Sequence, residues 1–80
     1  MKIELPSAEE QKSFYESQRE EMLKINLQNE FTRLRNEKRV ATSKDEEEVD
    51  NAKAEIKKIN KQFEIATQTI EVIDEQLKKL

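Results

Sequence analysis

The feature that most constrains this chain is an unbroken heptad of apolar residues in its C-terminal half. From Val49 to Leu80, apolar side chains recur at alternating intervals of three and four residues. This spacing keeps them on one side of an α-helix and is typical of the seam of a coiled coil or helical bundle. The predicted seam consists of Val49, Ala52, Ile56, Ile59, Phe63, Ala66, Ile70, Ile73, Leu77 and Leu80.

The composition favours helices throughout and argues against a strand-rich fold. The 80 residues include no Gly and one Pro, and 41% of them are charged. A sheet needs turns between its strands, and the residues that form turns are almost absent. The net charge of −3 and the strong periodicity argue against a disordered chain. We therefore expect a single all-α domain spanning residues 1–80.

Two capping patterns divide the chain into an arm and two helices. Ser7-Ala8-Glu9-Glu10 matches a capping box, in which a Ser hydroxyl and a Glu carboxylate satisfy the first free N–H groups of a helix. Ser43-Lys44-Asp45-Glu46 has the same form. The boundaries that follow are an extended arm at 1–7, a helix at about 8–41, a turn at about 42–43 and a helix at about 44–80.

The charges reverse sign at the same place as the second capping pattern. Arg33, Arg35, Lys38 and Arg39 precede Thr42 and Ser43, and Asp45, Glu46, Glu47 and Glu48 follow them. Cations favour the C-terminus of a helix and anions favour the N-terminus, because the helix dipole leaves opposite partial charges there. The pattern predicts a hairpin whose tip comprises Arg39, Thr42, Ser43, Lys44 and Asp45.

An alternative is one continuous helix, because neither Gly nor Pro forces a break at residues 41–44. Such a helix would be about 110 Å long at ~1.5 Å per residue. The seam would then have to continue through Ala41, Asp45 and Val49, and an Asp is a poor core residue. We favour the hairpin.

Folding the chain at 42–43 predicts which residues meet across the two helices. Phe31 would lie near Ala52 and Ala54, and Met22 would lie near Phe63, so that large side chains meet small ones at several levels.

The alternating residues at the N-terminus also have a predicted place. Ile3 and Leu5 would pack over Leu77 and Leu80 at the open end of the hairpin. The alternative is a short recognition strand that pairs with the edge of a partner's sheet.

Further apolar residues lie outside the seam and indicate that the hairpin is not the complete assembly. A two-helix hairpin buries one face of each helix, and what is left over must be covered by something else. We therefore expect an antiparallel two-helix coiled-coil hairpin that completes a helical bundle by oligomerisation. The candidate interface residues are Leu23, Leu27, Phe31, Leu34, Ile65 and Val72.

The residue types exclude several classes of function. The chain has no His and no Cys, so we expect no catalytic residues, no metal site and no cofactor. The basic residues before the turn are interspersed with acids such as Glu30 and Glu37, which argues against nucleic acid as a partner. No apolar run is long enough to span a membrane, and we expect a cytoplasmic protein. The preference for Lys over Arg is typical of an AT-rich bacterial or phage genome.

Three functional hypotheses remain, and all are non-enzymatic. The first is a self-assembling coiled-coil structural or scaffold element. The second is a small adaptor, chaperone or inhibitor that binds a larger, unidentified protein through an apolar helix face. The third is a nucleic-acid-binding accessory protein that uses the basic end of the first helix.

Overall fold

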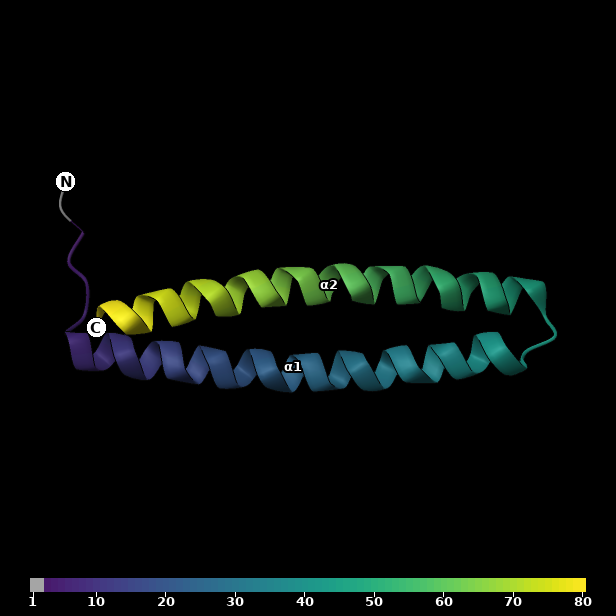
Figure 1. Ribbon diagram of the computed structural model, residues 1–80, viewed down its shortest axis with the longest axis horizontal. Helices are drawn as coiled ribbons and strands as arrows, with labels where there is room; N and C mark the ends of the chain where they lie inside the picture. The colour runs from purple at the N-terminus through teal and green to yellow at the C-terminus, as the bar shows by residue number, and fades with distance from the viewer. Residues whose placement is uncertain (1–2) are drawn as a thin grey trace.

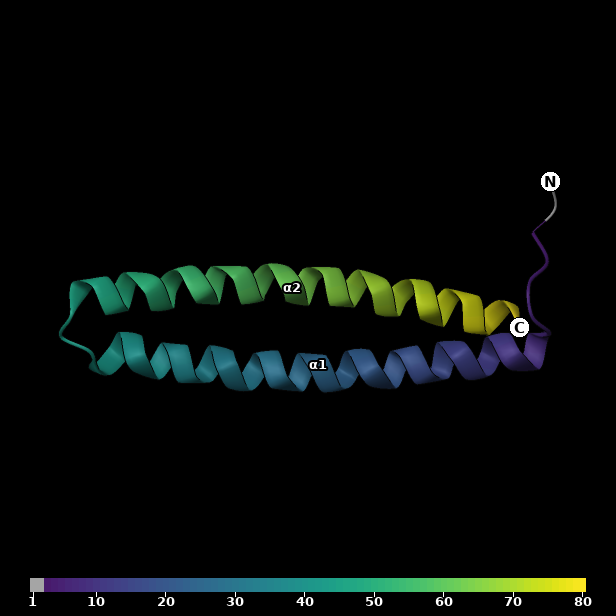
Figure 2. The same ribbon diagram turned by 180° about the vertical axis from the view of Figure 1, so that it is seen from behind.

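The computed structural model describes residues 3–80 and consists of two long helices folded back on each other. Helix α1 spans Ala8–Thr42 and helix α2 spans Glu46–Lys79. They run antiparallel side by side along their whole length, as the views from the front and from behind both show (Figures 1 and 2). The predicted helical hairpin is confirmed, and the single continuous helix is wrong. Met1 and Lys2, the start of the predicted arm, lie outside the described residues.

Helix α1 begins where the capping box predicts. The Ser7 hydroxyl accepts a hydrogen bond from the backbone N–H of Glu10 at 3.3 Å. The side-chain amide of Gln11 donates to the carbonyl of Pro6 at 2.7 Å and fixes the residues that enter the helix. Glu9 and Glu10 place negative charge in the first turn, where the helix dipole favours it.

The turn is formed by residues 43–45, and its capping residue differs from the prediction. Asp45, not Ser43, is the N-cap of α2, and its carboxylate accepts a hydrogen bond from the backbone N–H of Glu47 at 3.0 Å. Ser43 closes α1 instead, because its own backbone N–H donates to the carbonyl of Arg39 at 2.8 Å. The Ser43 hydroxyl then accepts from the backbone N–H of Asp45 and donates to the Glu48 carboxylate. One Ser thus links both helix ends.

The core lies between the helices and is made mainly by α2. Ala52, Ile59, Ala66 and Ile73 are between 1% and 4% exposed, and they occupy every second position of the predicted seam. The alternate seam residues are half-buried: Val49, Ile56, Phe63, Ile70 and Leu77. Leu80, at the end of the seam, is exposed. The core is therefore a single narrow row, and half of it is alanine.

Helix α1 presents a mostly polar face to this row. Its less exposed residues follow heptad spacing in the middle and C-terminal part of the helix: Met22, Asn26, Asn29, Arg33, Asn36 and Val40. Asn36 is 5% exposed and lines a shallow hollow with Ala52, whereas Phe31 was predicted to lie there. The turn comes later in the chain than predicted, which shifts the pairing of the helices by a few residues. Met22 accordingly lies by Ile65 and Ala66 instead of Phe63.

The described part of the N-terminal arm does not pack over the open end of the hairpin. Figure 1 shows the arm running past the end of α2 and away from both helices. Ile3 and Leu5 are 84% and 72% exposed, and Leu5 lines a hollow with Phe14 and Tyr15 of α1. This exposure contradicts the predicted packing of both residues over Leu77 and Leu80. No helix within residues 3–80 is both long and apolar enough to cross a lipid bilayer.

Helix α2 has isoleucines in a buried and in an exposed environment, so the same substitution should change the stability of the hairpin by different amounts at the two positions. Ile59→Ala should destabilise the hairpin by about 2–5 kcal/mol, because it removes a buried side chain and leaves a cavity. Ile65→Ala is the matched control, since Ile65 is 58% exposed on the same helix. Urea denaturation followed by circular dichroism measures both. An equal loss of stability in the two variants would contradict the described core.

Candidate interaction surfaces

An exposed apolar strip lies on the side of α1 that faces away from α2. We call Leu23, Leu27, Phe31 and Leu34 the α1 strip. Their exposed fractions run from 46% for Leu23 to 72% for Leu27, with Phe31 at 63%. At about 100° per residue, these positions are turned roughly 100–180° from Met22, which faces α2. The most apolar side of α1 is therefore uncovered in the single chain.

A second exposed apolar group lies on a different side of the molecule. Ile65 and Val72 of α2, which we call the α2 strip, are 58% and 55% exposed. Ile65 lines a hollow with Met22 and Ile25 of α1. Ile25 points about 160° away from Leu27 around the axis of α1, since two residues of helix rotate by about 200°. The structure therefore does not bring the six predicted interface residues together into one surface.

The predicted interface left out two exposed apolar side chains, Ile25 and Phe14, of which Ile25 lies beside the α2 strip. Phe14 lies near the start of α1, where its ring meets that of Tyr15 edge-on with centroids 5.5 Å apart. The sequence does contain a signal that could have identified Ile25. Asn26, Asn29 and Asn36 follow heptad spacing, which marks the face of the helix toward α2, and Ile25 lies next to that face.

The polar face of α1 is incompletely satisfied inside the hairpin. The side-chain carbonyl oxygen of Asn26 is buried and has no hydrogen-bond partner among the described residues. Burying a polar group without a partner costs roughly 1–3 kcal/mol. The contact between the helices is consequently weaker than an all-apolar seam of the same length.

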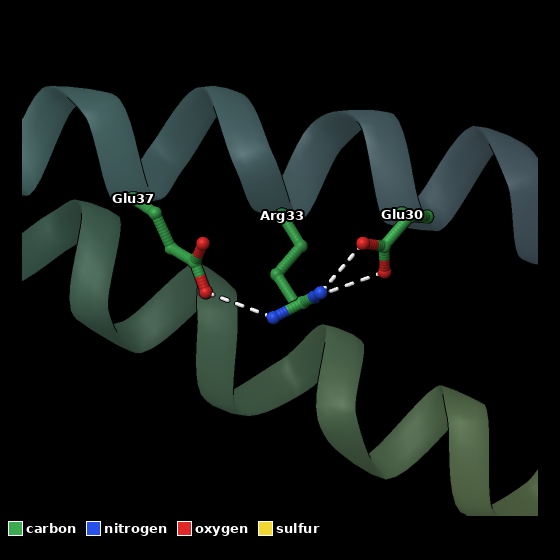
Figure 3. Close-up of polar contacts among 3 residues, drawn as sticks. All are labelled: Glu30, Arg33 and Glu37. Carbon is green, nitrogen blue, oxygen red and sulfur yellow. Dashed lines mark hydrogen bonds and ion pairs between the residues drawn. The ribbon is translucent and has the colours of Figure 1, made fainter.

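A charged cluster on α1 lies next to this polar face. The guanidinium of Arg33 donates two hydrogen bonds to the Glu30 carboxylate, at 2.6 and 3.1 Å, and one to Glu37 at 2.8 Å. Figure 3 shows Arg33 held between the two acids, all three on α1. The hydrogen bonds to Glu30, with the charges of both acids, raise the pKa of Arg33 above its ordinary value. Arg33 is therefore a permanent cation, and both of its acidic neighbours, Glu30 and Glu37, are already hydrogen-bonded to it.

Two further ion pairs join the helices near opposite ends of the hairpin. Arg39 meets Glu48 at 3.3 Å beside the turn, and Arg19 meets Asp74 at 3.0 Å near the open end. Because both pairs are half-exposed, each contributes little stability, but each favours this alignment of the helices over shifted ones.

Arg35 contacts an aromatic ring of its own helix. Its guanidinium carbon lies over the ring of Phe31, 6.0 Å from the ring centroid.

The predicted tip and the basic end of α1 consequently carry interleaved charges. Arg33 and Arg39 are each paired with acids. Lys44 lies at the turn beside Asp45 and Glu46. The described residues hold no group of three acidic, His or Cys side chains arranged to bind a metal ion. The tip is shaped by helix capping, and its Arg39 is paired with Glu48.

The unsatisfied Asn26 leads to a stabilising substitution. Asn26→Leu should raise the free energy of unfolding by about 1–3 kcal/mol, because it removes the unpaired oxygen and buries an apolar side chain against α2. Asn60→Leu introduces the same change at an exposed position of α2 and should alter stability by no more than about 0.5 kcal/mol. Urea denaturation of both variants measures the difference. Loss of stability in Asn26→Leu would show that this Asn has a partner after all.

A comparison with known proteins found no similar protein. No family model, curated protein or solved structure matches the chain.

Proposed function

We propose that this protein is a non-enzymatic, self-assembling structural module, in which hairpins join through the α1 strip. The observation that carries the proposal is the orientation of α1. Over residues 23–34, the side toward α2 carries Asn26, Asn29 and Arg33, whereas Leu27 and Phe31 of the α1 strip face solvent. Such an apolar strip is buried when an apolar surface is available.

The small core supports the same proposal. The buried apolar residues of the described chain are Ala52, Ile59, Ala66 and Ile73, all from α2. Short chains bury a small fraction of their surface, and they commonly gain stability by oligomerisation. Covering the α1 strip would add large side chains to a core that is now half alanine. Assembly would thus supply stability that one hairpin lacks.

The α1 strip is a better candidate than the α2 strip because it is longer and denser. Its residues are separated by three or four positions and therefore form a continuous ridge along about three helical turns. Ile65 and Val72 are separated by a full heptad, with the polar Thr69 between them. Two hairpins joined through α1 would form a four-helix assembly with α1 helices inside and α2 helices outside.

Paired aspartate substitutions test this choice of surface. Leu27→Asp with Phe31→Asp should weaken self-association about a hundredfold or more, since two charges would be buried in each interface half. Ile65→Asp with Val72→Asp makes the same change on the α2 strip and should leave the assembly mass unchanged. Sedimentation equilibrium over micromolar concentrations measures both variants beside the original chain.

Three results would contradict the proposal. A chain that remains a folded monomer at high micromolar concentration would exclude self-assembly and leave a binding module for another protein. Loss of mass in the α2 variant alone would move the interface to the opposite side. Retention by DNA or RNA that falls steeply with salt would favour the nucleic-acid hypothesis.

A further inference from the structure

We propose that the α1 strip pairs with the α1 strip of a second copy in antiparallel orientation, about a two-fold axis that crosses the strip between Leu27 and Phe31, at the height of Asn29. The inference rests on the proposed function and adds the geometry of the contact. In a two-fold contact the same patch meets itself, so each feature on one side of the axis needs a complement on the other side. The α1 strip and the charges at its ends have this symmetry.

The two central residues of the α1 strip are symmetric about position 29, and the two outer leucines are symmetric to within one residue. Leu27 and Phe31 lie two residues to either side of Asn29. In an antiparallel pair, Leu27 of one copy therefore lies opposite Phe31 of the other. Leu23 lies opposite Arg35 and Leu34 lies opposite Lys24, so that Leu23 and Leu34 of the two copies are offset by one residue. The apolar stems of Lys24 and Arg35 would cover these two leucines at the edge of the contact.

The charges that bound the strip are opposite in sign and equally distant from the same centre. Glu20 and Lys38 each lie nine residues from Asn29, on opposite sides. They are about five helical turns apart, so both point in the same direction as the α1 strip. Antiparallel pairing puts Glu20 of each copy opposite Lys38 of the other, and both pairs are attractive. Parallel pairing puts Glu20 opposite Glu20 and Lys38 opposite Lys38.

Both charged side chains are accessible for this contact. Glu20 pairs within its own helix with Lys24 at 3.7 Å, and both side chains of that pair are more than 70% exposed. Such a pair contributes little, and the Glu20 carboxylate retains acceptor positions for a second cation. Lys38 is exposed as well, one turn beyond Leu34. Glu20 and Lys38 can therefore form the proposed contact without any rearrangement of the hairpin.

Charge reversal tests the orientation, because the antiparallel contact has a distinctive pattern of rescue. Glu20→Lys alone and Lys38→Glu alone should each weaken self-association about tenfold, since each turns two attractive pairs into repulsive ones. The double variant in one chain should recover the original affinity. An equimolar mixture of the two single variants should also recover it, because both pairs in the mixed dimer are again attractive.

The readout is the dissociation constant from sedimentation equilibrium, with native mass spectrometry to count the mixed dimer. Circular dichroism confirms that each variant keeps its helices. Glu64→Lys and Lys57→Glu, on the outer surface of α2, are the matched controls and should leave the affinity unchanged. The difference between the single variants and the original should shrink at high salt, since the charges are exposed.

Failure of this inference is distinguishable from failure of the proposed function. If aspartates in the α1 strip abolish assembly while the single charge reversals change nothing, self-assembly stands and the antiparallel contact is overturned. If both single variants associate less well and neither the double variant nor the mixture recovers, the pairing of Glu20 with Lys38 is overturned. If the original chain does not associate, both the function and the contact are overturned.

Discussion

The packing of the α2 alanines and isoleucines against the side of α1 is the interaction on which the rest of the structure depends. Ala52 and Ala66 let the helix backbones approach, and Ile59 and Ile73 fill the space between these close points. This alternation fixes which side of α2 faces inward. It also requires α1 to present a matching side, and the side it presents carries Asn26, Asn29 and Asn36.

The consequence is a hairpin whose two helices are made differently. Helix α2 packs its apolar seam against α1, whereas the apolar strip of α1 faces solvent. Buried polar residues in a seam reduce stability, but they also select one alignment of the helices over others. Ion pairs near both ends of the hairpin, from Arg39 to Glu48 and from Arg19 to Asp74, favour the same alignment. The chain thus has a defined helix alignment and a small core.

The sequence predicted the two helices and their order because the signals were local. The heptad from Val49 to Leu80, the Ser7 cap and the charge reversal near Thr42 each depend on neighbouring residues. The capping residue of α2 was missed because Ser43 and Asp45 are both good N-caps, and the choice depends on how the turn closes.

The pairing of individual residues was less predictable, because the face of α1 toward α2 is polar. Folding the chain at 42–43 led us to place Phe31 near Ala52, and the structure places Asn36 there instead. The spacing of apolar residues along α1 did identify Leu23, Leu27, Phe31 and Leu34 as residues that the hairpin leaves exposed. Their separation from Ile65 and Val72 needed three-dimensional structure, since it depends on the rotation of both helices.

The most direct test of this account is the distance between two copies of α1, measured by double electron–electron resonance. The chain has no Cys, so a single introduced Cys carries one spin label per copy. A label at Gln28→Cys lies beside the proposed axis and should give a distance of about 20 Å or less, whereas Lys12→Cys should give about 50 Å at ~1.5 Å per residue. Short distances at both positions, or no dipolar signal at either, would contradict an antiparallel pair of α1 helices.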